Sequence, residues 1–380
     1  MAGRAYNPLG YEPELHGGLT KPPKEVMDTY AKIMAERRAK AKSFTFDEAR
    51  EHLEHGEGDV LGHYIYEMMF DIYAGIEDEI MEGAIDTHLH IYPDYVPRTT
   101  DIIQLAIDAS NAGYRAICCK DHFFNNVAGA WGAQWVVEDL VRRGELKRAC
   151  KVFGTNMLAW SYHPDQIELI SKYPNLGGVF FPTMTGGRPG RGGPLLPILD
   201  DNGKLMPEVK ECIRRMADHH ICVFSGHRIY PETLAMVQYC NEVGAHILLT
   251  HAGGRLSRIG AAGTVEQQKE LIKLGAYIEL STHWFVGASA IWPVNDPTEL
   301  PDYLKAMGPE CIDHIVMGTD LGQPTVIHPI DGYRCSIRCL LHSGISKEDL
   351  KIICQKSGAE ALYLDEKETT VHTVYTSQGG

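Results

Sequence analysis

The sequence has 380 residues, of which 44% are hydrophobic and 23% charged, and its formal net charge at pH 7 is −14. This composition is typical of a soluble globular protein, and the acidic surplus argues against binding to nucleic-acid phosphates, which requires clustered Lys and Arg. No apolar run approaches the roughly 18 to 20 residues that cross a bilayer, and the N-terminus lacks the pattern of an export signal. We therefore expect a cytoplasmic protein that acts on small molecules, with no nucleic-acid or membrane partner.

Residues 1–81 differ from the rest of the chain. They combine a stretch rich in Ala, Lys, Glu and Arg with a Met-rich and aromatic stretch that has helical spacing. We expect a helical N-terminal extension that packs on the main domain or on a second copy of the chain, which would make the protein a homo-oligomer. Residues 368–380 are predicted to form a short C-terminal tail.

Residues 82–367 alternate short apolar, β-branched runs with amphipathic stretches, a pattern typical of repeated βα units on a parallel sheet. Eight such units predict a (β/α)8 TIM barrel. The predicted strands are 84–90, 114–120, 150–157, 177–183, 220–225, 245–251, 276–281 and 314–319. The predicted helices between them include 100–112, 132–143, 165–172, 207–219, 231–243 and 265–274.

Two long segments interrupt the βα pattern. Residues 186–203, with six Gly and three Pro, follow the fourth strand, and residues 284–309 follow the seventh. Both are predicted to be loops over the barrel mouth and are candidate lids. The aromatic residues near them indicate a substrate with an apolar or aromatic ring; they are Trp160, Phe180, Phe181, Trp284 and Trp292.

Polar residues end most of the predicted strands, at the barrel end where catalytic groups of TIM barrels lie. His88 and His90 close the first strand, and side-chain alternation sends both into the barrel lumen. The others are Lys120 and His122 on the second strand, His227 and Arg228 on the fifth, His251 on the sixth and Asp320 on the eighth. Imidazole and carboxylate ligands suit Zn, Mn, Fe or Co, so the sequence predicts a divalent-metal site.

The ordered set His88-Leu-His90, His227, His251 and Asp320 resembles the amidohydrolase superfamily, which are metal-dependent hydrolases on a TIM barrel. The strings AIDTHLHIYPD, GYRAICCKDH, SGHRIYPETL, LLTHAGG and GTDLGQP are similar to an uncharacterised amidohydrolase-like group. The resemblance implies one or two metal ions, with zinc as the first candidate. With one ion, His88, His90, His227 and Asp320 would hold it while His251 hydrogen-bonds the reacting water. With two ions, His227 and His251 would take the second.

The chain departs from this superfamily on the fourth strand, where a carbamylated Lys or a Glu usually bridges two metals. The predicted strand ends there with Phe181-Pro182-Thr183. Lys120, the only strand-end lysine, is a hypothetical bridge if CO₂ carbamylates it. It could equally remain unmodified and stabilise developing negative charge or hold a substrate carboxylate.

A second set of residues is predicted to bind substrate or to support the site. An arginine in a βα-loop can clamp a carboxylate or phosphate. The substrate-binding candidates are Arg98, His122, Arg228, His283, Trp284 and Arg334. Glu279 and Asp86 are candidates for fixing the tautomer of a ligand imidazole.

These residues favour a hydrolase in which metal-bound hydroxide attacks the carbonyl of an amide, cyclic amide or ester. Asp320 would shuttle the proton to the leaving group, and the metal with Lys120 or a histidine such as His251 would stabilise the oxyanion. A decarboxylase or hydratase acting on a small carboxylic acid is the alternative on the same scaffold. A non-catalytic metal- or ligand-binding barrel is the third.

Overall fold

The computed structural model describes Asp28 and residues 76–183, 196–253, 262–283, 299–324 and 326–367. The chain divides into two compact units, Met1–Asp78 and Glu79–Gly380. Most of the predicted extension at 1–81 and all of the predicted tail at 368–380 lie outside the described residues. Both assignments therefore stay predictions, and the barrel lies in the second unit.

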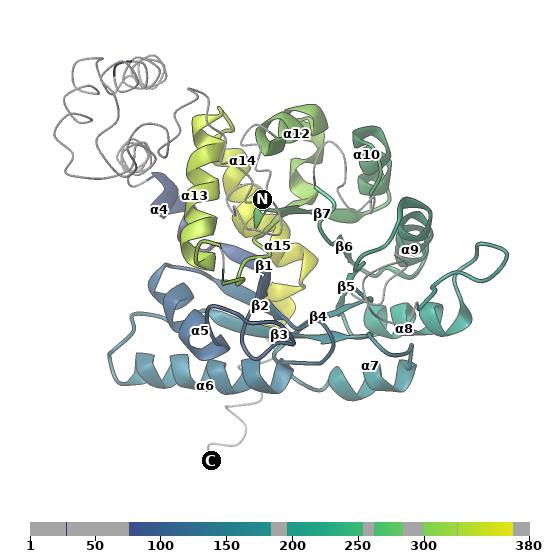
Figure 1. Cartoon of the computed structure of the whole chain (residues 1–380), viewed down its shortest axis with the longest axis horizontal. Coiled ribbons are helices and arrows are strands. Elements are labelled where there is room, and N and C mark those ends of the chain that lie inside the picture. The colour runs from purple at the N-terminus through teal and green to yellow at the C-terminus, as the bar shows by residue number, and fades with distance from the viewer. Residues whose placement is uncertain are drawn as a thin grey trace, which may run out of the picture. The chain divides into compact units, whose positions relative to one another are not determined.

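Eight parallel strands form one sheet whose order follows the chain, with helices arranged around it (Figure 1). Each strand overlaps a predicted range, so the (β/α)8 barrel is confirmed. The strands are β1 Ile85–His90, β2 Ala116–Lys120, β3 Lys151–Met157, β4 Leu176–Phe180, β5 Cys222–Phe224, β6 Ile247–Leu249, β7 Ala276–Ser281 and β8 Ile315–Gly318.

The six predicted helices correspond to α5 through α10. The described helices are α4 Ile76–Met81, α5 Ile102–Asn111, α6 Val127–Arg142, α7 Pro164–Ile170, α8 Pro207–Asp218, α9 Tyr230–Val243, α10 Val265–Lys273, α12 Glu299–Met307, α13 Pro329–His342, α14 Lys347–Lys351 and α15 Ser357–Ala361, with a 3-10 helix η1 at Pro309–His314 and a π-helix η2 at Ile352–Lys356. Among the described residues, no helix has the length and apolar character that crossing a bilayer requires.

The prediction of one long loop at 284–309 is wrong in its second part, because residues 299–307 form α12. Leu300, Tyr303, Leu304 and Met307 are buried at helical spacing, a pattern that the nearby prolines obscured in the sequence. Residues 284–298 lie outside the described residues, as do 184–195 of the other candidate lid. The structure describes the predicted loop 186–203 from residue 196 onward. Leu199 in this part forms an isolated β-bridge with Leu205, which lies just beyond the predicted loop.

Hydrogen bonds between β1 and the segment that follows β8 close the barrel. The Asp320 amide donates to the His88 carbonyl at 2.7 Å, and the His90 amide donates to the Leu321 carbonyl at 2.8 Å. These bonds tie the first strand end to the last strand end. They place the backbone of Asp320 beside the two histidines of β1.

The buried carboxylate of Asp86 adds a second tie between the same two strands. It accepts hydrogen bonds from the Thr319 amide at 3.0 Å, the Thr319 hydroxyl at 2.7 Å and the His88 amide at 3.1 Å. The prediction that Asp86 fixes a ligand imidazole is therefore wrong. Its side chain binds backbone and hydroxyl donors, and it supports the site by joining β1 to β8.

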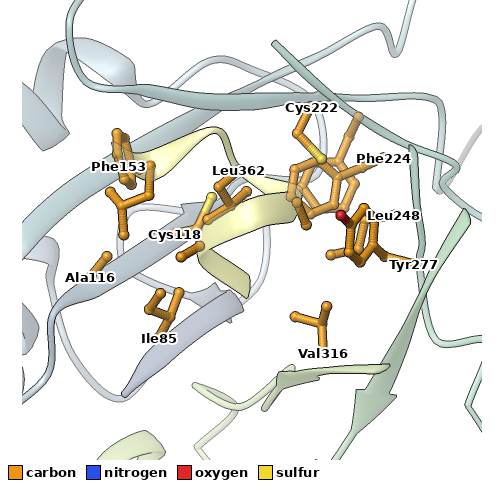
Figure 2. Packing of buried hydrophobic residues seen from close by; sticks show 14 of the residues in the cluster. Ile85, Ala116, Cys118, Phe153, Cys222, Phe224, Leu248, Tyr277, Val316 and Leu362 are labelled. Carbon is orange, nitrogen blue, oxygen red and sulfur yellow. The ribbon is translucent and has the colours of Figure 1, made fainter. Parts of the chain in front are cut away.

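An apolar cluster fills the barrel below the strand ends (Figure 2). Leu362, just after α15, lies among side chains from the strands, so the C-terminal helix packs against the barrel interior. Other members of the cluster are Ile85, Cys118, Phe153, Phe180, Phe224, Leu248, Tyr277 and Val316. Because this part of the interior is packed with apolar side chains, the polar chemistry is confined to the carboxyl ends of the strands.

Candidate metal centre

Four polar side chains converge at the carboxyl end of the barrel. His88 and His90 lie on β1, His251 follows β6, and Asp320 follows β8; all four are buried. His251 and Asp320 have φ values of 55° and 53°, in the left-handed region that residues with a Cβ seldom adopt. Such backbone strain concentrates at functional sites, where the surrounding structure holds it in place.

Asp320 lies at the centre of this group. Its Oδ1 lies 3.0 Å from His90 Nε2 and 3.4 Å from His88 Nε2, and its Oδ2 lies 3.1 Å from His251 Nε2. The His88 and His251 rings stack with centroids 5.0 Å apart. Three imidazoles therefore face one carboxylate, in surroundings that exclude most water.

Glu279 on β7 supports His88 from the other side of the ring. Its Oε1 lies 2.8 Å from His88 Nδ1, and both side chains are fully buried. Burial raises the pKa of the Glu279 carboxyl to about 8. In its ionised form this carboxylate favours a proton on Nδ1 and leaves Nε2 as the ligand atom, since metal-binding histidines commonly donate their other N–H to a carboxylate. Glu279 therefore contacts the imidazole of His88, which the sequence predicts to be a metal ligand.

Burial sets the protonation of the two β1 histidines. Burial lowers the pKa of His88 well below its ordinary value, and the nearby Lys120 charge lowers it further. Burial and the Arg98 charge lower the pKa of His90 to about 4. Both rings are therefore neutral near pH 7, the form that binds metals. Burial opposes the charged form of Asp320, but His251, His88 and hydrogen bonds outweigh it and hold the pKa of this carboxyl well below its usual range.

The donor set fits a divalent metal ion. Among the described residues, two buried groups of three have ligand atoms within 4.8 Å of one another, His88–His90–Asp320 and His88–His251–Glu279. His88 Nε2 is buried and makes no hydrogen bond within the described part of the chain, although Asp320 Oδ1 lies 3.4 Å away, and an unsatisfied buried nitrogen of this kind is consistent with a metal ligand. Glu279 already contacts Nδ1 of His88. The group His88–His90–Asp320 therefore fits a metal ion better than the group that contains Glu279.

Lys120 ends β2 in register with His90. Its side chain is buried, and Nζ lies 4.9 Å from the centroid of the Phe180 ring. It makes no hydrogen bond or salt bridge to any described residue. Burial lowers the pKa of Lys120 to about 8. Lys120 is therefore a buried amine next to the histidines that is still mostly protonated at pH 7 but loses its proton more readily than an ordinary lysine.

His227 lies beside His251, with ring centroids 5.0 Å apart. Its backbone amide donates to the Pro182 carbonyl at 3.2 Å. It belongs to none of the ligand groups found among the described residues. The structure thus brings His227 to the predicted side of the site without placing it in the cluster around Asp320.

A third group of potential ligands, His90, Asp94 and His122, surrounds the guanidinium of Arg98. Arg98 Nη2 lies 2.6 Å from Asp94 Oδ2, 3.1 Å from His90 Nδ1 and 3.2 Å from His122 Nδ1. His122 also stacks on His90 with centroids 4.6 Å apart. This group therefore already holds a cation, which is the arginine itself. Sequence reasoning missed Asp94, and its position four residues after His90 was the available signal.

The three arginines predicted to clamp the substrate are found in protein contacts or in a helix. Arg98 is engaged by Asp94. Arg228 is fully buried, and its terminal nitrogens donate to the Leu196 carbonyl and the Tyr162 hydroxyl at 3.0 Å each. Arg334 lies within α13, so its placement in a βα-loop is wrong. The Arg228 guanidinium is enclosed by protein, and its predicted role as a substrate clamp stays a prediction.

His283, two residues after β7, is buried, and its amide donates to the Thr319 carbonyl at 2.9 Å. Burial lowers its pKa, and the charge of Asp320 partly offsets this. The hydrogen bond to Thr319, the residue before Asp320, brings the backbone of His283 close to the centre. Trp284 and Trp292 lie outside the described residues, so their predicted roles stay predictions.

The family model for DUF6282, described as a family of unknown function, matches residues 83–279, a little more than half of the chain. The chain belongs to DUF6282. The matched region contains the two β1 histidines, Lys120, His251 and Glu279 and ends before Asp320. A search of curated proteins found no match.

Solved structures show what the DUF6282 barrel resembles. An amidohydrolase from Pseudomonas aeruginosa superposes with a TM-score of 0.50 at 12% identity, covering 76% of this chain and 97% of that one. Dihydroorotase from Saccharomyces cerevisiae superposes with a TM-score of 0.49 at 12% identity, covering 74% and 84%. The superposition on the Pseudomonas aeruginosa amidohydrolase shows that the two chains share a fold.

Replacing Glu279 by Ala is expected to weaken Zn²⁺ binding by about 10- to 100-fold, because His88 loses the partner that orients its ring. Competition with a chromophoric chelator measures this affinity. Glu279→Gln keeps an oxygen acceptor at the same place and should weaken binding less than Glu279→Ala. Equal affinities for the wild type and Glu279→Ala would show that this contact does not act on the metal.

Proposed function

We propose that this chain is a metal-dependent hydrolase that cleaves an amide, a cyclic amide or an ester in a small molecule. The observation that carries the proposal is the buried cluster of His88, His90, His251 and Asp320, in which the imidazoles face one carboxylate. Glu279 supports this cluster through His88. A set of this kind suits Zn, Mn, Fe or Co.

In this proposal His88, His90 and Asp320 hold one ion, with His227 as a further ligand. His251 then either hydrogen-bonds the reacting water or takes a second ion together with His227. A divalent ion in such a site lowers the pKa of bound water to about 7 and polarises a substrate carbonyl.

Asp320 is assigned the proton transfer. Its Oδ2, which faces His251 Nε2 at 3.1 Å, accepts a proton from the attacking water and passes it to the leaving group. Its depressed pKa keeps the carboxylate ionised before the reaction.

Lys120 is assigned to stabilise negative charge on the substrate. As a free ammonium it stabilises the oxygen on which charge develops, or holds a carboxylate. As a carbamate it would supply an anionic metal ligand, and its pKa of about 8 gives a larger fraction of the neutral amine that reacts with CO₂ than an ordinary lysine has. Native mass spectrometry at high resolution distinguishes these two states of Lys120.

The lyase alternative is favoured by a site with one metal ion together with an arginine that grips a substrate carboxylate. The three candidate arginines do not support it: Arg98 pairs with Asp94, Arg228 is enclosed, and Arg334 lies in α13. Hydrolysis therefore remains the function that the geometry favours.

A substrate panel on metal-loaded full-length protein tests this function. The panel contains cyclic amides, lactones, phosphoesters and aromatic carboxylic acids, and each assay is repeated after chelation and after reloading with Zn²⁺. We expect hydrolysis of an amide or ester that disappears on chelation and returns on reloading. Decarboxylation of an acid without any hydrolysis would replace the hydrolase by the lyase, and chelator-resistant hydrolysis would remove the metal from the reaction.

A further inference from the structure

Aromatic side chains gather in the loops after β1, β2 and β3, at the same barrel end as the metal centre. Tyr95 is 52% exposed, Phe124 64% and Trp160 58%, while Phe123 is half-buried. Exposed aromatic rings that cluster commonly mark a binding site, whereas single exposed rings need no explanation. Phe180 and Phe181, predicted from the sequence to meet a ring, are instead fully buried.

These rings form a continuous series of contacts that reaches the candidate metal ligands. Trp160 stacks on Phe123, with centroids 5.5 Å apart and planes at 28°. Tyr95 then makes near-perpendicular ring contacts with both Phe123 and His122 at centroid distances of 5.1 Å. His122 in turn stacks on His90 at 4.6 Å. We name Tyr95, Phe123 and Trp160 the aromatic wall.

Local hydrogen bonds hold two members of the aromatic wall in place. The Asp121 carboxylate accepts from the Phe123 amide at 2.7 Å and from the Phe124 amide at 2.9 Å. The Asp94 carboxylate accepts from the Tyr95 amide at 2.7 Å, and Asp94 is itself fixed by Arg98. A wall fixed before binding loses little conformational entropy when a ligand arrives.

We propose that the aromatic wall binds a planar, aromatic or conjugated ring carried by the substrate, next to the group that reacts at the metal centre. This assignment rests on the proposed function, because it places the reacting group at His88, His90 and Asp320. The continuity of rings from Trp160 to His90 favours a substrate group over a separate protein partner. Flat ring faces also favour a planar ligand over a saturated one.

Ligand-observed NMR titration of full-length, Zn²⁺-loaded protein tests the proposal with benzamide and cyclohexanecarboxamide, which differ in ring planarity. We expect benzamide to bind the wild type about three- to tenfold more tightly, the size of typical ring-pair effects. Trp160→Leu and Phe123→Leu should bring the ratio close to one. Trp160 is exposed, so its replacement should leave the fold intact.

Trp131→Leu is the matched control. Trp131 is also exposed, at 44%, but it lies on α6 and contacts Trp135. The ratio should stay at its wild-type value in this variant. A ratio near one in the wild type, no binding of either amide, or an unchanged ratio in both wall variants would overturn the proposal.

Two measurements on the same samples separate this proposal from others. Metal analysis separates it from the proposed function: a metal-free wild type that still prefers benzamide through Trp160 would refute the metal centre and support the wall. Size-exclusion chromatography with light scattering reports the oligomeric state. A Trp160→Leu variant that changes this state and leaves the benzamide ratio unchanged would make the wall a subunit contact and overturn its assignment to substrate.

Discussion

Asp320→Asn is expected to lower kcat/KM by about 10²- to 10⁴-fold, the usual contribution of a positioned general acid or base. Asparagine keeps the shape of the side chain but cannot accept and return a proton. His251 Nε2, at 3.1 Å from Oδ2 in the wild type, would also face an amide group instead of a carboxylate. Steady-state kinetics on the best substrate of the panel measures the effect.

Metal content and a matched variant complete this experiment. Asp313→Asn changes an exposed aspartate in η1 that pairs with Lys356, and it should keep wild-type kinetics. Because Asp320 is also assigned as a ligand, elemental analysis of Asp320→Asn shows whether lost activity reflects lost metal. Activity at the wild-type rate in Asp320→Asn would contradict its role as proton shuttle.

Asp86→Ala is expected to lower the free energy of unfolding by about 3–5 kcal/mol, because each buried donor left without a partner costs about 1–3 kcal/mol. The change removes the acceptor of three donors, the Thr319 amide, the Thr319 hydroxyl and the His88 amide. Urea unfolding followed by circular dichroism measures the loss. A loss below about 1 kcal/mol, within the range of ordinary surface substitutions, would mean that these bonds do not stabilise barrel closure.

Asp86→Asn is the matched control and carries a pH signature. Burial raises the pKa of Asp86 to about 7 in the folded protein, whereas an unfolded aspartate titrates near about 3.9. Between these values the folded protein binds a proton that the unfolded chain releases, so stability falls as pH rises. The wild type should therefore lose stability relative to Asp86→Asn from about pH 4 to pH 7. A constant difference across this range would contradict the raised pKa.

The rim of the barrel was predictable because two local rules determine it. Alternation along β1 sends His88 and His90 to one side, and parallel strands bring their carboxyl ends to one end of the barrel. His251 and Asp320 lie two residues beyond their strands and have left-handed backbones, so only the second rule predicts their place. Glu279 lies inside β7 and points to the lumen by the same alternation.

Other features depend on tertiary contacts that periodicity does not encode. Asp94 lies in a loop, where side-chain direction depends on Arg98 and His122 rather than on a repeating backbone. Arg228 directly follows the predicted ligand His227, but its side chain is directed to Tyr162 and the Leu196 carbonyl. Asp86 fits the alternation along β1, yet its carboxylate accepts hydrogen bonds from Thr319, which follows β8. Strand-end patterns therefore predicted where the site lies better than which partner each side chain takes.

The central claim is that the buried cluster around Asp320 is a metal centre, and elemental analysis of protein purified without chelator tests it most directly. We expect at least one Zn, Mn or Fe ion per wild-type chain and little or none in His88→Ala. His219→Ala, which changes a surface histidine paired with Glu168, should match the wild type. A wild type that contains no metal and does not bind Zn²⁺, Mn²⁺ or Fe²⁺ on addition would contradict the claim.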